Sequence, residues 1–131
     1  MIKLLRGLSV MLPRDKPCHL LGVGDIFCIT NTVGFGIDTY DSSFPTKLAR
    51  HGRLLVRDGC INIKSTAFLN DFGPIERGCL CFTCANHSRS YVHHLFKANE
   101  LTALTLASIH NVHFMCAFMS QLREKILNDE I

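Results

Sequence analysis

Three cysteines within six residues constrain this chain more than any other feature. Cys79, Cys81 and Cys84 form a C-x-C-x-x-C knuckle, and thiolates at this spacing match the donors that a tetrahedral Zn²⁺ site requires. The alternative, three cysteines without a metal, is uncommon for such clustering. A structural zinc site has four protein ligands and no open position, so we expect the metal to stabilise the fold while any chemistry takes place elsewhere.

The fourth ligand is less certain from spacing alone. His110 lies on an expected helix downstream of the knuckle, and its position slightly favours it as the fourth ligand. Four other histidines compete with it: His87, His93, His94 and His113. A ligand must bring its ring to the knuckle when the helices pack, and spacing does not decide which histidine does so.

The composition indicates a globular protein of one domain's length. The 131 residues are 47% hydrophobic and 19% charged, a balance that permits a buried core. The net charge of +3 is compatible with a polyanionic partner but does not establish one. No stretch is expected to approach the ~20 apolar residues of a membrane span, so no membrane partner is expected.

The cysteine count argues against a disulfide framework. Seven is an odd number, and the apolar run at the start of the chain is broken by Arg6 and has no small-residue cleavage site. A reducing, cytoplasmic environment is therefore expected. The remaining cysteines are interpreted as buried or idle thiols: Cys18, Cys28, Cys60 and Cys116.

The first part of the chain has the pattern of a βαβ unit. Residues 19–24 form an apolar run that ends in glycines, Ile26, Ile29 and Val33 recur at near-helical spacing, and residues 36–41 indicate a second strand. This order favours a parallel sheet or barrel. In such folds the carboxyl ends of the strands carry the chemistry, and Asp41 stands at such an end.

The second part predicts a hairpin followed by helices. Residues 53–57 and 60–64 flank Asp58-Gly59, a dipeptide that favours a type I′ turn. Ser88 is the expected N-cap of a helix that extends to about residue 98. Its apolar face is expected to hold Tyr91, Val92, Leu95 and Phe96. A last long helix is expected to bury Leu101, Leu104, Ser108, Val112, Met115, Met119, Leu122 and Ile126.

Two further features are compatible with ligand binding. A strand-end aspartate such as Asp41 can act as a nucleophile or general base, although most only cap the next turn. A basic loop with Lys47, Arg50, His51 and Arg53 follows it, which suits a phosphate-bearing substrate; a solvated charged surface is the alternative. Gly22-Val23-Gly24 is no dinucleotide fingerprint and indicates a close backbone approach to a ligand.

Several of these segments together resemble one family. Residues 21–24, 36–41, 44–52, 61–63, the knuckle, 88–95 and 109–111 are similar, in order and spacing, to the C-terminal third of tRNA-guanine transglycosylase, also called queuine tRNA-ribosyltransferase. The resemblance covers nearly the whole chain from about Pro17. It implies an α/β fold, the C-terminal part of a (β/α)8 TIM barrel with a zinc-binding subdomain. Residues 1–52 would be the last βα units, and residues 53–131 the hairpin, knuckle and C-terminal helices.

The resemblance also implies roles for individual residues. Asp41 falls on the nucleophile, and Cys79, Cys81, Cys84 and His110 fall on the zinc ligands. Leu21 stands beside the bound base, where the family commonly has methionine. The implied tRNA-binding residues are Gly22, Val23, Gly24, Asp25, Ile26, Phe27 and Cys28 in one loop, and Thr46, Lys47, Leu48, Ala49 and Arg50 in the segment that recognises the wobble position. Lys47 replaces the family's usual arginine and loses its bidentate fork.

The implied reaction exchanges guanine at the wobble position of tRNA anticodons for queuine or its precursor, through a covalent Asp41–ribosyl intermediate. The implied partners are tRNA and a deazaguanine base, with a dimer in the full-length family. A barrel needs about 250 residues, so the chain is expected to be a partial enzyme. The alternatives are a zinc-stabilised RNA-binding module without catalysis, or a non-catalytic partner subunit, against which the retained Asp41 argues.

Overall fold

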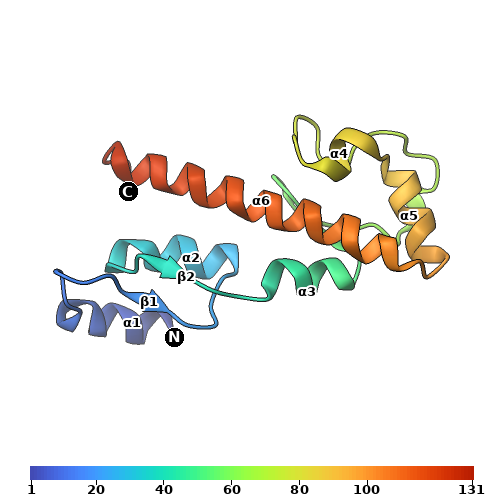
Figure 1. The fold of residues 1–131 in the computed structure, drawn as a ribbon. Helices are drawn as coiled ribbons and strands as arrows, with labels where there is room; N and C mark the ends of the chain where they lie inside the picture. Colours follow the sequence, from blue (N-terminus) through green and yellow to red (C-terminus); the bar gives the residue numbers. More distant parts are fainter. The chain divides into compact units, whose positions relative to one another are not determined.

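The computed structural model describes residues 1–131 and is a mixture of helices and short strands (Figure 1). Two compact units divide the chain: Met1–Phe44 together with Ile131, and Pro45–Glu130. The division falls earlier than the boundary after residue 52 that was expected from the sequence. The functional assignment of the two parts stays a prediction.

The first unit contains the expected strand–helix–strand order. β1 (His19–Leu20) pairs in parallel with β2 (Thr39–Tyr40), and α2 (Ile26–Thr32), extended by a 3₁₀ turn at Val33–Phe35, connects them. Before β1 lie α1 (Ile2–Leu8) and a second 3₁₀ turn (Ser9–Met11). Both strands are shorter than predicted. β1 ends early because Gly22, with φ of +71°, turns the chain after two paired residues.

The second unit surrounds one apolar core. It comprises α3 (Phe44–Arg50), β3 (Arg53–Val56), β4 (Gly59–Asn62), a 3₁₀ turn (Thr66–Phe68), α4 (Phe82–Asn86), α5 (Arg89–Lys97) and α6 (Leu101–Leu127). α6 contacts α4, α5 and β3. The core residues are Ala49, Leu54, Ile63, Ile75, Val92, Leu95, Phe96, Ala103, Leu106 and Ala107. Apolar burial of this kind, at about 25 cal/mol per Å², is the main stabilising term of such a unit.

The hairpin forms where it was predicted, but its turn is displaced. Val56 pairs with Gly59, so Arg57 and Asp58 are the two linking residues instead of Asp58 and Gly59. Asn99 and Asp129 are the non-glycine residues with positive φ, whereas a type I′ turn needs positive φ at both central residues. The prediction of that turn type was therefore wrong. Gly59, with φ of +124°, takes the unusual conformation at the start of β4.

The helix after Ser88 confirms the predicted start. The Ser88 side chain accepts a hydrogen bond from the backbone N–H of Tyr91, the expected N-cap geometry. Val92, Leu95 and Phe96 are buried as predicted. Tyr91 is not: it is exposed, and its ring stacks on His87 with centroids 5.1 Å apart.

α6 forms as predicted, and its buried face agrees with the prediction only in part: Met115 and Leu122 are buried and Leu104 is partly buried against the core, as expected. Leu101, Val112 and Ile126 are exposed, while the buried positions are Ala103, Leu106, Ala107, His110, Asn111, Met115 and Leu122. His110 and Asn111, which are polar, lie at the centre of the buried face, so a purely apolar pattern could not locate the whole of it. Both side chains form hydrogen bonds to β3, which are described below.

α6 is also long and apolar enough to cross a membrane by length and composition, contrary to the expectation that no stretch approaches such a span. A third of its most apolar window is buried (33%), and Ala103, Leu106 and Ala107 belong to the core of the second unit. A core helix of a globular protein meets the same criteria, so the feature is weak support for a membrane span.

Candidate functional site

The three knuckle cysteines and His110 converge in the second unit. The ligand atoms of Cys79, Cys81, Cys84 and His110 all lie within 4.8 Å of one another. The three sulfurs are 3.9, 3.6 and 3.4 Å from His110 Nδ1. Zn–S bonds of about 2.3 Å and Zn–N bonds of about 2.0 Å in a tetrahedron place sulfur and nitrogen about 3.5 Å apart. The four residues form a tetrahedral-type metal site that fits the structural zinc of the family identified below.

The hydrogen bonds of His110 aim it at the cysteines. Its Nε2 lies 2.7 Å from the carbonyl oxygen of Leu55, and a carbonyl only accepts, so Nε2 carries the proton. Nδ1 therefore presents its lone pair to the sulfurs. Metal-binding histidines commonly have their second nitrogen fixed in this way.

Asn111, the next residue, completes the attachment of α6 to β3. Its Oδ1 accepts from the backbone N–H of Leu55 at 2.9 Å, and its Nδ2 donates to the carbonyls of Arg53 (2.9 Å) and Pro45 (3.0 Å). Both backbone polar groups of Leu55 are thus satisfied by consecutive residues of α6. The same contact between α6 and Leu55 therefore connects the metal site to the β3–β4 hairpin.

Burial determines the protonation of the ligands before a metal binds. It raises the pKa of the Cys84 thiol to about 12 and raises that of Cys79, and it lowers the pKa of His110. The imidazole is therefore neutral, the form in which histidine binds metals. The Cys79 and Cys84 thiols are therefore protonated, so a cation must displace their protons when it binds.

The competing histidines lie outside this cluster. The His93 ring is buried and bonds through Nδ1 to the Ile63 carbonyl at 2.7 Å. His87 stacks on Tyr91 and meets Phe82 edge-on. The cluster contains His110 and none of the alternatives.

A second arrangement surrounds Asp41 in the first unit, just after β2. Asp41 Oδ1 accepts from the backbone N–H of Gly22 at 2.9 Å and lies 2.9 Å from His19 Nε2. The other ring nitrogen of His19 lies 2.8 Å from the Thr39 hydroxyl. The Gly22 bond first, and the His19 bond second, hold the pKa of Asp41 below its usual value. Asp41 is therefore an exposed, anionic carboxylate.

The loop Gly22-Val23-Gly24 lies against this carboxylate. Gly22 supplies the N–H described above, and a Cβ on Gly24 would come 2.5 Å from the Cβ of Ser42. The close approach predicted for this loop is thus an approach to Asp41 and its neighbour. Ligand binding by this loop stays a prediction.

The residues expected to bind tRNA occupy two segments. Leu21 to Gly24 are in the loop, Asp25 caps α2 through a 2.9 Å bond from the N–H of Cys28, and residues 26–28 are the first turn of that helix. Leu21 and Phe27 are exposed. Thr46 to Arg50 lie on α3, so Lys47 and Arg50 of the expected basic loop are helical, whereas His51 follows the helix in a turn and Arg53 begins β3. Their RNA-binding roles stay predictions.

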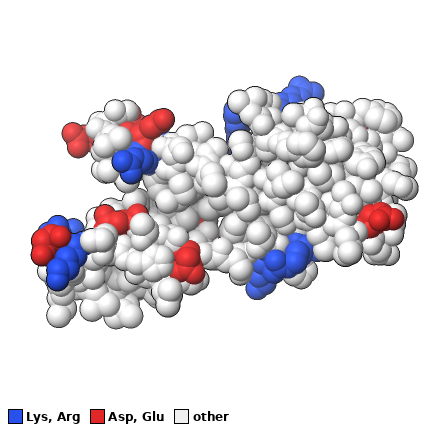
Figure 2. Space-filling model, in the orientation of Figure 1, with Lys and Arg blue, Asp and Glu red and all other residues white.

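α3 presents positive charge to solvent. Lys47 and Arg50 lie in its last turn and are exposed, and Figure 2 shows basic side chains together over this helix. Ala49 between them is fully buried in the core. The helix is thus anchored on one face and cationic on another.

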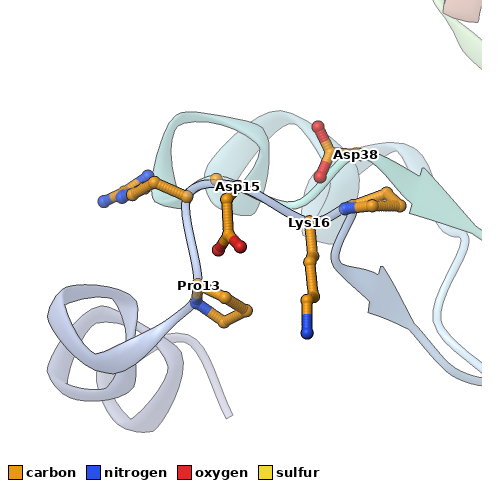
Figure 3. Close-up of a pocket in the computed structure, with 7 residues that line it drawn as sticks. Pro13, Asp15, Lys16 and Asp38 are labelled. Carbon is orange, nitrogen blue, oxygen red and sulfur yellow. The ribbon is translucent and has the colours of Figure 1, made fainter.

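The first unit also contains an open cavity of about 330 Å³, lined by Pro13, Arg14, Asp15, Lys16, Pro17, Gly36 and Asp38. Figure 3 shows Pro13, Asp15 and Lys16 on one segment and Asp38 on another, the segment that leads into β2. Asp38 has a structural role, because its Oδ2 accepts a hydrogen bond from the backbone N–H of Cys18 at 2.7 Å. Asp41 does not line this cavity.

His19 is the site residue that sequence reasoning missed. It was treated only as the first residue of a strand, yet it contacts Asp41 directly. The strand register His19↔Thr39 brings them together, and no local motif encodes that register. A histidine and an aspartate in the two strands of one βαβ unit were the available signal.

These observations define an α/β protein with a structural-type zinc centre and an anionic aspartate at the end of a parallel strand. The chain belongs to the queuine tRNA-ribosyltransferase family, whose family model matches residues 1–131. It is 50% identical over 121 residues to the queuine tRNA-ribosyltransferase of Protochlamydia amoebophila (strain UWE25), a match that covers 92% of this chain and 31% of that protein.

Two further relatives are also queuine tRNA-ribosyltransferases. The queuine tRNA-ribosyltransferase of Chlamydia abortus is 52% identical over 121 residues, covering 92% of this chain and 32% of that protein. That of Chlamydia caviae is 52% identical over 137 residues, covering 96% and 37%. The chain therefore spans about a third of the length of the curated relatives it matches.

Proposed function

We propose that this chain carries the nucleophile and the zinc subdomain of a tRNA-guanine transglycosylase. The observation that carries the proposal is the Asp41 carboxylate, which is exposed and is held by the Gly22 N–H and the His19 ring. A carboxylate that only capped a turn would bond to the N–H groups that follow it. Asp41 instead bonds backward, to the loop after the neighbouring strand.

In the proposed reaction, a carboxylate oxygen of Asp41 attacks the anomeric carbon of the wobble ribose and guanine leaves. The incoming deazaguanine base then attacks the covalent ribosyl–enzyme and releases Asp41. The logic is that of a retaining glycosidase. Anticodon loops suit the reaction because their bases are already single-stranded and cheap to unstack.

Substrate binding is assigned to the two segments near the strand ends. Lys47 and Arg50 on α3 would contact phosphates, which supply most of the salt-dependent affinity for RNA. The loop from Gly22 to Cys28 would contact the nucleotides beside the wobble position, and Leu21, whose side chain is 79% exposed, would lie against the base.

The zinc site has a structural role in this proposal. Cys79, Cys81, Cys84 and His110 would hold the ion, and the closed set of four protein donors leaves it no substrate position. A bound zinc ion would cross-link the knuckle cysteines to His110 on α6. The chain's own residues, Asn111 and Leu55, carry that constraint to the hairpin.

The wider context also belongs to the proposal. The parallel β1–β2 pair with its connecting helix would be part of a (β/α)8 barrel, whose catalytic residues lie at the carboxyl ends of strands. We further propose a cytoplasmic enzyme that forms a dimer and takes queuine or its precursor as the incoming base.

Radiolabelled guanine exchange tests this function. The protein to use is a hybrid in which this chain replaces the matching segment of the Protochlamydia amoebophila relative, so that the nucleophile is presented in a complete enzyme. We expect the hybrid to incorporate guanine into tRNA, and Asp41→Asn to abolish incorporation while zinc content is unchanged. Incorporation that survives Asp41→Asn contradicts the proposal.

One observation favours a second candidate, a zinc-stabilised RNA-binding module without catalysis. The metal site, Lys47 and Arg50 all belong to the second compact unit, and Asp41 does not. A hybrid that binds tRNA with zinc bound, but exchanges no guanine, would support this candidate.

A further inference from the structure

We propose that His19 is a positioning residue for Asp41: its ring anchors Oδ1 and leaves Oδ2 as the oxygen that attacks the ribose. This inference rests on the proposed role of Asp41 as nucleophile. It adds a residue, and an assignment of the two carboxylate oxygens, to that role.

The backbone register creates the contact. His19 and Thr39 are paired residues of β1 and β2, and side chains two apart along an extended chain point to the same side. Asp41, two residues after Thr39, therefore comes within reach of His19. The ring spans the two, with Nδ1 at 2.8 Å from the Thr39 hydroxyl and Nε2 at 2.9 Å from Asp41 Oδ1.

The network assigns the protons on the ring. A carboxylate only accepts, so Nε2 carries a hydrogen toward Asp41. In the neutral ring Nδ1 then accepts from the Thr39 hydroxyl. The carboxylate thus selects the tautomer, and the Thr39 hydroxyl, which can donate or accept, holds the ring in the orientation that points Nε2 at Asp41.

The two hydrogen bonds to Asp41 converge on one oxygen. Gly22 N–H and His19 Nε2–H both reach Oδ1, and neither reaches Oδ2. Two donors from different directions fix the rotation of the carboxylate, which is otherwise free in an exposed aspartate. Oδ2 keeps its lone pairs for substrate, and such restraint of a nucleophile's orientation is a large part of enzymatic rate.

The chemistry follows from this assignment. The lone pair of Oδ2 forms the bond to the anomeric carbon, and the bond from that carbon to guanine breaks with its electrons going to the base, which a general acid outside the Asp41–His19 pair protonates. Oδ1 becomes the carbonyl oxygen of the ester and still accepts from Gly22 and His19. When a ring nitrogen of the incoming base attacks, the carbon–Oδ2 bond breaks and its electrons return to the carboxylate, while the proton of that nitrogen passes to the conjugate base of the same general acid. The charge of the restored carboxylate is stabilised by the same two donors.

Steady-state kinetics of the hybrid protein defined above test the inference. His19→Ala removes the anchor and is expected to lower kcat about 10- to 100-fold, the scale of a nucleophile misplaced by about 1 Å. KM for tRNA should stay within about twofold, because a contact needed only for the reaction does not contribute to ground-state binding. His19→Gln places an amide N–H near the position of Nε2 and is expected to recover most of kcat.

Threonine variants provide a matched comparison. Thr39→Val removes the hydroxyl that orients the ring and should lower kcat by a smaller factor than His19→Ala. Thr30→Val is the control, since Thr30 is also exposed and its hydroxyl bonds only to the Ile26 carbonyl within α2. Thr30→Val should leave kcat unchanged.

The outcomes separate this inference from the proposed function. If the parent hybrid exchanges guanine and His19→Ala retains its kcat, or if kcat/KM falls through KM alone, His19 does not position Asp41 and the nucleophile assignment is untouched. If the parent hybrid exchanges none although folded, the proposed function fails.

A second measurement on the full chain does not depend on activity. Nitrogen-15 NMR of the histidine rings should show His19 with a protonated Nε2 and a bare Nδ1, and the Nε2 resonance should shift in Asp41→Ala. An unchanged His19 resonance in that variant would refute the contact itself.

Discussion

Removal of the Asn111 side chain should destabilise the second unit more than any other single hydrogen-bonding change in it. Asn111 is fully buried and makes three hydrogen bonds, to the Leu55 N–H and to the carbonyls of Arg53 and Pro45, at 2.9, 2.9 and 3.0 Å. Asn111→Ala leaves all three backbone groups without that partner.

The magnitude follows from their burial. An unsatisfied buried polar group costs about 1–3 kcal/mol. The Leu55 N–H is enclosed and should cost near the upper value, while the two carbonyls are partly buried and water can reach them. We therefore expect the free energy of unfolding to fall by about 3–5 kcal/mol, a large part of the 5–15 kcal/mol that is usual for a domain.

Urea unfolding of the full chain, followed by circular dichroism at a fixed free zinc concentration, measures this change. Asn86→Ala is the matched control, because the Asn86 side chain is exposed and its bond to the Phe82 carbonyl lies within α4; it should cost less than about 0.5 kcal/mol. Asn111→Asp keeps the acceptor for Leu55 but offers the two carbonyls no donor, so it should be at least as damaging at neutral pH. A loss below about 1 kcal/mol for Asn111→Ala would refute the reasoning, since each orphaned group alone is worth that much.

Three other changes have defined outcomes. The purified chain should contain one zinc, and Cys81→Ser should lower both the zinc measured by elemental analysis and the melting temperature; unchanged values would contradict the metal site. In the hybrid protein, Lys47→Ala and Arg50→Ala should each reduce the slope of log affinity against log salt for tRNA by about 0.7–0.9, whereas Lys125→Ala in the last turn of α6 should not; equal slopes in the Lys47→Ala, Arg50→Ala and Lys125→Ala variants would show that the charges of α3 are only a solvated surface. The Arg89 hydrogen bond holds the pKa of Asp71 below its usual value, so the ion pair stabilises the fold above the unfolded pKa and loses that effect as pH falls through the folded one; the stability difference between the parent and Asp71→Asn should shrink on acidification from pH 6 to about pH 3, and a constant difference would rule the pair out as its source.

Local signals in the sequence predicted the elements that local chemistry determines. The knuckle spacing located the metal site, Ser88 located the start of α5, and Asp58-Gly59 located the hairpin within one residue. Each depends on residues close together in the chain. The zinc cluster itself is confirmed, including His110, which spacing alone had only favoured.

Features that depend on distant residues were missed. The buried face of α6 contains His110 and Asn111, whose side chains bond to Leu55, 55 and 56 residues away in sequence. An apolar pattern therefore found Met115 and Leu122 on this face but also selected Leu101, Val112 and Ile126, which are exposed. His19 meets Asp41 only through the register of two strands. The short basic segment after Asp41 is a helix because Ala49 packs into the core of the second unit.

The central claim is that Asp41 is the nucleophile, and covalent trapping tests it most directly. The hybrid protein is incubated with substrate tRNA, denatured, digested, and analysed by mass spectrometry for a ribosyl-linked peptide. The account predicts an adduct that survives denaturation, lies on the peptide containing Asp41 and is lost in Asp41→Asn, because an amide is not an effective anionic nucleophile. An adduct that persists in Asp41→Asn, or that maps to another residue, would contradict it.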